Sequence, residues 1–127
     1  MSSILFAYST YFKLKLGLYV EKITYIDNLM NTNEIKTYRL IIKGKVQGVG
    51  FRHWFSDLAI SLGLNGYIQN KESKDEVEAI IQGDMQSILS ITEKAKDGPS
   101  LALVEGVIPN SIISNVKYSG FIVKYET

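Results

Sequence analysis

Residues 45–54 read Lys45-Val46-Gln47-Gly48-Val49-Gly50-Phe51-Arg52-His53-Trp54. This segment joins an alternating sequence to one with helical periodicity, so it predicts the end of a strand, a tight turn and the first turn of a helix. The two glycines of the turn permit backbone conformations that other residues resist. Arg52 stands at the helix start, where free N–H groups and the helix dipole attract negative charge. The segment therefore predicts a site for a phosphate, sulfate or carboxylate.

The sequences on either side of this turn have clear and different periods. The preceding residues predict a strand over 36–46, in which Tyr38, Leu40, Ile42 and Val46 alternate with Arg39, Ile41, Lys43 and Lys45. The following residues predict a helix with the apolar stripe Phe51, Trp54, Phe55, Leu58, Ala59 and Leu62. Gly63 stands where a glycine commonly ends a helix.

The rest of the chain predicts a hairpin, a second helix and further strands. Strands are expected over 64–70 and 76–82, with a charged turn over 71–75 between them. Asp84 is expected to cap a helix that ends before Gly98-Pro99, and whose inner stripe is Met85, Ile88, Leu89, Thr92 and Ala95. Strands are also expected over 101–108 and 120–125. The order βαββαβ, with a possible extra edge strand, predicts an α+β, ferredoxin-like α/β sandwich: an antiparallel sheet with both helices on one face.

Length and composition indicate one globular domain. The chain has 127 residues, of which 46% are apolar and 21% charged, and its net charge of +1 argues against a dedicated duplex-DNA binder. It has no cysteine, which excludes disulfides, zinc–thiolate sites and cysteine nucleophiles. No apolar run approaches the ~20 residues that span a bilayer.

Residues 1–35 are predicted to be an N-terminal extension, not native or poorly ordered, of a domain over 36–127. Residues 1–29 lack the basic start and cleavage site of a secretory signal. Met30 precedes a polar stretch and the first clear strand. We therefore hypothesise that Met30 is the natural start, which the terminal mass of protein made from its native gene would decide.

The predicted fold brings a second polar group near the anion site. In a split βαβ unit, the end of the strand at Asn70 can lie close to the turn at 47–52. An Asn can both donate and accept, so it can orient a water molecule without acting as a base. The sequence has no carboxylate cluster for Mg²⁺ and no Walker motif. Such a site suits an acyl phosphate, because the departing carboxylate has a reference pKa of about 4 and needs no proton.

Three segments resemble the acylphosphatase family over about residues 36–127. Its signature G-x-V-Q-G-V-x-F-R is similar to Gly44-Lys45-Val46-Gln47-Gly48-Val49-Gly50-Phe51-Arg52, and its second motif to Gly66-Tyr67-Ile68-Gln69-Asn70. Asp97-Gly98-Pro99 before Leu103-Val104-Glu105 resembles a third family segment. The resemblance implies hydrolysis of acyl phosphates without a metal or covalent intermediate. It implies that Arg52 binds phosphate, that Asn70 orients the attacking water, and that a phosphate oxygen accepts the water proton.

The candidate site residues follow from this resemblance and from the turn itself. Arg52 and Asn70 are expected to be catalytic, and the phosphate-binding loop is expected to comprise Gln47, Gly48, Val49, Gly50, Phe51 and Arg52. We expect a monomeric, cytoplasmic enzyme without cofactor or metal. Its partners would be a small-molecule acyl phosphate and the product inorganic phosphate, with no nucleic acid and no membrane. The alternative is a non-catalytic anion- or RNA-binding module of the same fold.

Two positions differ from the family pattern, and three neighbours of the site have plainer interpretations. Gln69 occupies a position that is usually basic, and the turn after Asn70 lacks glycine and is one residue longer. His53 is interpreted as a surface residue of the helix. Trp54 and Phe55 are interpreted as core residues.

Overall fold

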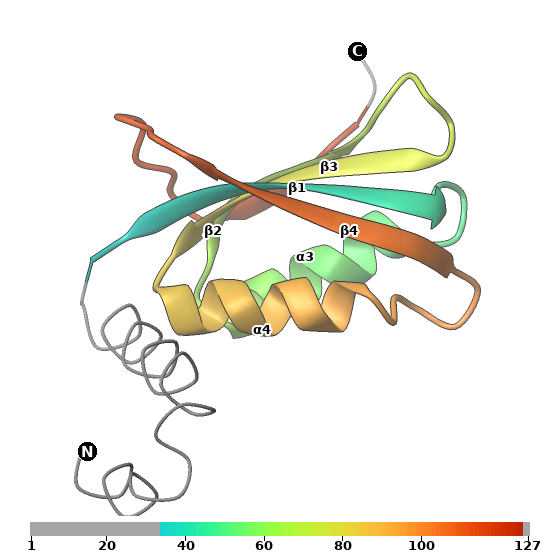
Figure 1. Cartoon of the computed structure of the whole chain (residues 1–127), viewed down its shortest axis with the longest axis horizontal. Helices are drawn as coiled ribbons and strands as arrows, with labels where there is room; N and C mark the ends of the chain where they lie inside the picture. The colour runs from blue at the N-terminus through green and yellow to red at the C-terminus, as the bar shows by residue number, and fades with distance from the viewer. Residues whose placement is uncertain (1–33, 126–127) are drawn as a thin grey trace, which may run out of the picture. The chain divides into compact units, whose positions relative to one another are not determined.

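The computed structural model describes residues 34–125, which form five strands and two helices (Figure 1). The elements are β1 Lys36–Lys45, α3 Phe51–Ser61, β2 Asn65–Asn70, β3 Glu76–Gly83, α4 Met85–Ala95, β4 Leu103–Ile112 and β5 Phe121–Lys124. The first six follow the predicted order, and β5 is the predicted extra edge strand. The hypotheses on residues 1–29 and on Met30 concern residues outside the described part, so they stay predictions, as does the domain boundary at residue 36.

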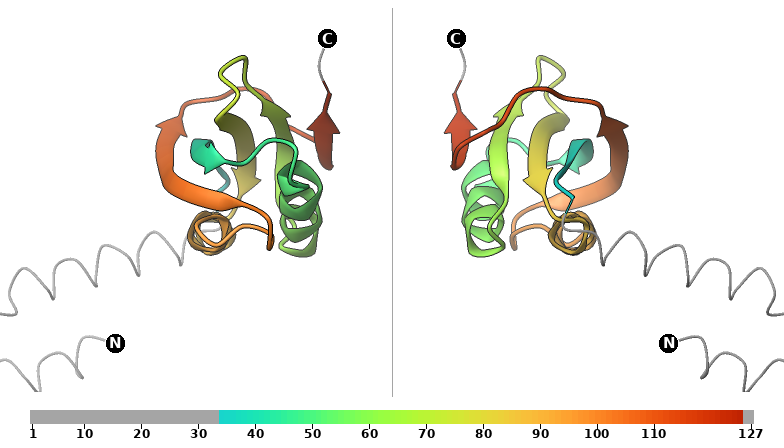
Figure 2. Two further views of the ribbon diagram at one scale, coloured as in Figure 1. Left: turned by 90° about the vertical axis from the view of Figure 1, so that its right-hand side faces the viewer. Right: turned by 90° about the vertical axis from the view of Figure 1, so that its left-hand side faces the viewer.

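The strands form one sheet in the order β4-β1-β3-β2-β5. β1 is antiparallel to β3 and β4, and β2 is antiparallel to β3. β5 departs from the predicted antiparallel arrangement because it runs parallel to β2, with Gly66 opposite Phe121. Both helices cover the same face of the sheet (Figure 2). The ferredoxin-like α/β sandwich is therefore confirmed, with a parallel strand added at one edge.

The core lies between the sheet and the helices. Its largest fully buried side chains come from strands, helices and the loop after β1: Leu40, Ile42, Val46, Phe51, Phe55, Ile68, Val77, Ile81, Ile88 and Ile91. The Phe55 ring lies 6.1 Å from Phe51 and 5.8 Å from Phe121, centre to centre. The prediction that Phe55 is a core residue is confirmed. Trp54 is only half-buried, with its ring centre 5.4 Å from that of Phe51.

Helix α4 begins as predicted but buries a different stripe. Asp84 is the N-cap and accepts a hydrogen bond from the Ser87 N–H at 2.9 Å. The buried residues are Met85, Ile88, Ile91 and Ala95, whereas Leu89 is 39% exposed. The predicted stripe was wrong at Leu89. The buried residues are three or four positions apart and share one face of the helix, whereas Leu89 lies about 100° from Ile88 around the helix axis, outside that face.

A glutamine fastens the chain between β4 and β5 to the sheet. Gln82 is 6% exposed. Its Nε2 donates to Thr37 Oγ1 at 2.9 Å and to the Val116 carbonyl at 2.8 Å, and its Oε1 accepts from the Tyr118 N–H at 2.9 Å. A buried carboxamide with these partners incurs little desolvation cost. The contact pairs the end of β3 with the start of β1, so it lies at the end of the sheet away from the β1–α3 loop.

Candidate active site

The β1–α3 loop has the conformation that its glycines predict. Gly48 and Gly50 have φ angles of 72° and 80°, in the left-handed region that side chains resist. A Cβ atom at either position would meet nothing within 4 Å. The glycines are therefore required by backbone conformation, and the space above the loop is open to a ligand.

The loop leads into an uncapped helix. Gly50 is the N-cap of α3, no side chain accepts a hydrogen bond there, and the first turn contains no acidic residue. The first backbone bond of the helix runs from the Trp54 N–H to the Gly50 carbonyl at 3.1 Å. The N–H groups of the first turn have no carbonyl one turn earlier to bond, so they can bind an anion. Helix α4, by contrast, has its own carboxylate cap at Asp84.

Arg52 contacts Lys124 and Tyr125, the last two described residues. Its Nη1 donates to the Lys124 carbonyl at 3.1 Å. Its guanidinium carbon lies 4.9 Å from the centre of the Tyr125 ring, which is the geometry of a cation–π contact. These contacts use one of the five guanidinium donors, and the others remain able to bind phosphate oxygens.

Tyr125 also contacts the only histidine. Its hydroxyl lies 2.7 Å from His53 Nε2, and the two ring centres are 6.0 Å apart. His53 is exposed, as its interpretation as a surface residue requires. Lys124 and Tyr125 were not expected from the sequence as neighbours of Arg52. No local pattern could have done so, because their position depends on the pairing of β5 with β2.

The two halves of the predicted site are joined by Gln47. Its Nε2 lies 3.0 Å from the Lys71 carbonyl, 3.1 Å from that of Ser73 and 2.8 Å from that of Glu76. These carbonyls belong to the turn that follows Asn70 and to the first residue of β3, so the loop and the end of β2 lie together as expected. The Gln47 side chain is used within the protein. The group of Gln47 that could bind a phosphate is therefore its backbone N–H.

Asn70 is the last residue of β2 and lies opposite Val77 on β3. Its Oδ1 atom is buried and has no hydrogen-bond partner among the described residues. Buried polar atoms in proteins nearly always have a partner, so an unpartnered one indicates a missing ligand or water. Asn70 Oδ1 can therefore accept a further hydrogen bond.

Gln69 lies in a polar row across the open face of the sheet. Its Nε2 donates to Glu78 Oε1 at 2.8 Å, and Arg39 forms an ion pair with the same carboxylate. Burial acts to raise the pKa of Glu78, but the hydrogen bonds from Arg39 and Gln69 outweigh it and hold the pKa below its ordinary value. Burial, and secondly the negative charge of Glu78, raise the pKa of Tyr67. Lys124 Nζ lies 3.7 Å from the centre of the Tyr67 ring. The neutral Gln69, next to Asn70 in the chain, therefore adds a hydrogen bond to the Arg39–Glu78 ion pair.

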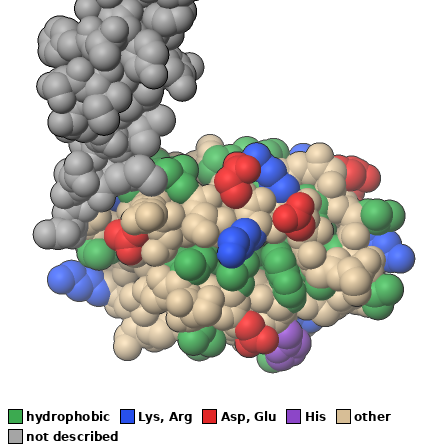
Figure 3. Space-filling view, turned by 90° about the horizontal axis from the view of Figure 1, so that it is seen from below, with side chains coloured by type: hydrophobic (Ala, Val, Ile, Leu, Met, Phe, Trp, Pro, Cys, Tyr) green, Lys and Arg blue, Asp and Glu red, His purple; other side chains and the backbone are tan. Residues whose placement is uncertain are grey.

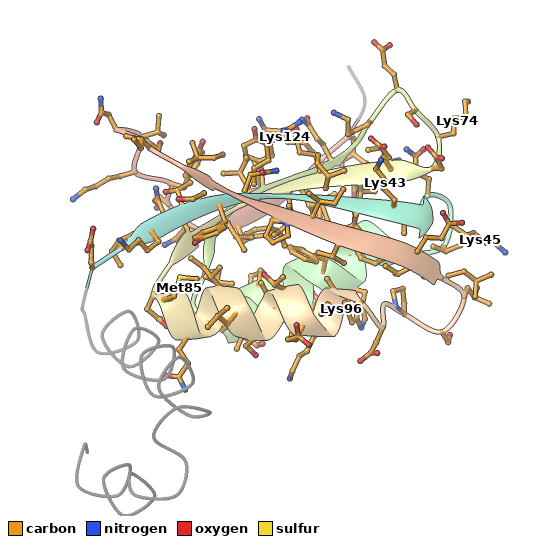
Figure 4. All side chains as sticks on the ribbon, viewed as in Figure 1. Lys43, Lys45, Lys74, Met85, Lys96 and Lys124 are labelled. Carbon is orange, nitrogen blue, oxygen red and sulfur yellow. The ribbon has the colours of Figure 1, made fainter. Side chains whose placement is uncertain are left out.

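Lysines surround this end of the sheet. Lys43, Lys45 and Lys74 lie where β1 meets the loop and where β2 turns into β3 (Figure 4). Lys43 Nζ lies 3.5 Å from Glu76 Oε2. Lys45 and Lys74 are exposed, and they take part in no ion pair within residues 34–125. Their charges favour the approach of anions.

Neither a metal cluster nor a membrane span is found in the described part of the chain. Within residues 34–125, no group of three or more His, Asp or Glu residues could hold a metal ion. None of the helices described there combines the length and hydropathy needed to cross a bilayer.

Comparisons with known proteins point to one family. The family model described as acylphosphatase matches residues 38–123. An acylphosphatase from Dehalococcoides mccartyi is 41% identical over 87 residues, which cover 68% of this chain and 96% of that protein. The structure of an acylphosphatase from Coxiella burnetii is 34% identical, with a TM-score of 0.67, and covers 71% of this chain and 93% of the other. The structure of an acylphosphatase from Bacillus subtilis is 28% identical, with a TM-score of 0.68, and the match covers 72% of this chain and 100% of that one.

Proposed function

The chain belongs to the acylphosphatase family, and we propose that its reaction is carried by the β1–α3 loop, Arg52 and Asn70. The activity itself is acyl phosphate hydrolysis, which produces a carboxylate and orthophosphate. The observation that carries the assignment of residues is geometric. The loop before the uncapped helix start with Arg52 is joined by the Gln47 side chain to the carbonyl of Lys71, the residue after Asn70, whose Oδ1 has no partner among the described residues.

Binding of the phosphoryl group is assigned to the loop and to Arg52. The free N–H groups from Gln47 to Arg52 would donate to phosphate oxygens, and the helix dipole adds a favourable field. Arg52 would bind further oxygens with its forked donors, while Lys124 and Tyr125 hold its guanidinium. The interactions strengthen as charge accumulates on the phosphoryl oxygens, so they stabilise the transition state.

The chemical step needs a positioned water and little else. Asn70 would orient a water molecule in line with the bond to the departing carboxylate. The water oxygen forms a bond to phosphorus, and the bond from phosphorus to the carboxylate oxygen breaks with its electron pair. The water proton goes to a phosphoryl oxygen, so no protein base takes part. A leaving carboxylate with a pKa of about 4 needs neither an acid nor a metal.

A non-catalytic anion- or RNA-binding module is not favoured by the comparisons, whose matched relatives are named acylphosphatases. Acidic and basic side chains are interspersed on the helical face (Figure 3), and the net charge of +1 lacks the basic excess typical of nucleic-acid binders. We propose that nucleic acid is not a partner. The monomeric state and the cytoplasmic location stay predictions from the sequence.

Hydrolysis of benzoyl phosphate, with orthophosphate as competitor, tests the proposal. The wild-type chain should hydrolyse this substrate, orthophosphate should compete with it, and EDTA should leave the rate unchanged. Binding of orthophosphate without hydrolysis would favour the binding module instead. Inhibition by EDTA that a divalent metal reverses would refute the metal-free mechanism.

A further inference from the structure

We propose that Gln47 is a positioning residue that keeps Asn70 in register with the anion loop. The inference rests on the proposed function of Arg52 and Asn70 and assigns a role that the sequence analysis did not. There, Gln47 was expected to belong to the phosphate-binding loop, and its side chain was given no role. Its carboxamide joins the loop to the turn between β2 and β3.

The orientation of the Gln47 carboxamide is determined by its neighbours. Its Nε2 faces the carbonyl oxygens of Lys71, Ser73 and Glu76 at 2.8–3.1 Å. Only the NH₂ end can donate to three acceptors, since the amide oxygen would be repelled by all of them. Two hydrogens are thus shared among three carbonyls.

The turn itself has few other restraints. Glu72, Ser73, Lys74 and Asp75 are exposed. Within the turn, the Lys71 N–H donates to the Glu76 carbonyl at 3.1 Å, the Glu76 N–H donates to the Ser73 carbonyl at 3.2 Å, and the Ser73 hydroxyl donates to Asp75 Oδ1. One further bond, from the Gly44 N–H to the Asp75 carbonyl at 2.9 Å, ties it to β1. Gln47 is the side chain that connects this turn to the anion loop.

The pose of Asn70 depends on the turn as well as on the sheet. Asn70 is the last residue of β2, where it pairs with Val77, it immediately precedes the turn, and its Oδ1 has no hydrogen-bond partner among the described residues. A shift of the turn therefore disturbs this last strand pair and the orientation of the Asn70 carboxamide. Small misplacements of a group that orients the nucleophile reduce the rate strongly.

The loop is held independently of Gln47. Val46 and Phe51, on its two sides, are each 1% exposed and belong to the core. When the Gln47 donors are removed, the exposed turn moves and the loop stays. Hydrolysis should then slow while phosphate still binds.

The test compares Gln47→Met with Gln82→Met. Both variants replace a carboxamide that fastens a loop by an apolar side chain of similar length, but Gln82 lies at the other end of the sheet. Kinetics with benzoyl phosphate are measured at a temperature where circular dichroism shows both variants to be folded. Gln47→Met should lower kcat by about tenfold or more and change the orthophosphate inhibition constant by less than about threefold. Gln82→Met should keep kcat within about twofold of wild type. An equal loss of kcat in both variants would overturn the proposal.

Gln47→Glu supplies a pH readout that lost stability would not produce. A carboxylate facing three carbonyls is repelled, whereas the protonated acid regains one donor. The kcat of Gln47→Glu, relative to that of Gln47→Met, should rise as the pH falls from about 7 to about 5. A flat ratio would contradict the role of the donor.

Amide hydrogen exchange separates this inference from the proposed function. The amides of Lys71 and Glu76 should exchange at least about fivefold faster in Gln47→Met than in wild type, and unchanged rates would refute the contact. A wild-type chain that does not hydrolyse benzoyl phosphate would refute the proposed function. The exchange rates would then still decide whether Gln47 holds the turn.

Discussion

Arg52 lies above Tyr125, with 4.9 Å between its guanidinium carbon and the centre of the aromatic ring. Its Nη1 also donates to the carbonyl of the preceding residue, Lys124. A long side chain at a helix start is thus held in one orientation by the far end of the chain. Holding an Arg in place before the ligand arrives lowers the entropy cost of binding.

Loss of the Tyr125 ring should weaken phosphate binding. A cation–π contact at an exposed site contributes about 0.5–1 kcal/mol, so Tyr125→Leu should raise the orthophosphate inhibition constant about two- to fivefold. Tyr125→Phe keeps the ring and loses only the contact to His53, so it should have the smaller effect. If Tyr125→Phe proves as damaging as Tyr125→Leu, the hydroxyl and not the ring holds Arg52.

Arg52→Ala should remove nearly all hydrolysis. Charge-assisted hydrogen bonds contribute about 1.5–3 kcal/mol each, so losing a pair of them should lower kcat/KM at least about a hundredfold. Arg39→Lys is the matched control, because Arg39 pairs with Glu78 on the open face of the sheet. It should retain most of the activity. Circular dichroism verifies that both variants are folded, and substantial hydrolysis by Arg52→Ala would exclude this residue as the phosphate ligand.

Replacing Asn70 should affect the chemical step more than binding. Asn70→Ala should lower kcat by about a hundredfold or more while the orthophosphate inhibition constant changes less than about threefold. Asn65→Ala is the control at the opposite end of β2, where Asn65 Oδ1 accepts from the Gly120 N–H at 2.8 Å. It should leave kcat nearly unchanged. An effect of Asn70→Ala confined to binding would argue against water orientation.

The Glu78 carboxylate should make stability depend on acidity. Its pKa is lower in the folded chain than in the unfolded chain, so the unfolded state takes up a proton first. The contribution to stability is present above the unfolded pKa and is lost as the pH falls from the unfolded pKa through the lower folded one. Glu78→Gln removes this group, so its Tm should fall less than that of wild type over the same range. A parallel fall in both proteins would assign the acid sensitivity to other carboxyl groups.

The sequence predicted the elements whose periodicity is local. The alternation of Leu40 and Ile42 and the helical stripe from Phe51 to Ala59 are each set by the face that meets the core. Leu89 was wrongly placed because an apolar residue beside a stripe can be buried or exposed depending on how the helix rotates on the sheet. Periodicity within one segment contains no information on that rotation.

The site was predictable where a motif is continuous and unpredictable where separate segments meet. Gly48 and Gly50 have the positive φ angles that a tight loop requires. The position of Tyr125 depends on a parallel pairing between β2 and β5, which no short segment reveals. The side-chain contacts of Gln47 were not predicted, because the three carbonyls that its Nε2 meets belong to a different part of the chain.

The short strand β5 links the position of Arg52 to a part of the sheet that can open without unfolding of the whole domain. It has four residues, lies at the edge of the sheet, and is followed by the tyrosine that supports Arg52. Edge elements of this length open more readily than the core. Fraying of β5 would therefore release the guanidinium while β1, β2, β3 and β4 stay paired. On heating, activity is expected to decline before the global unfolding transition.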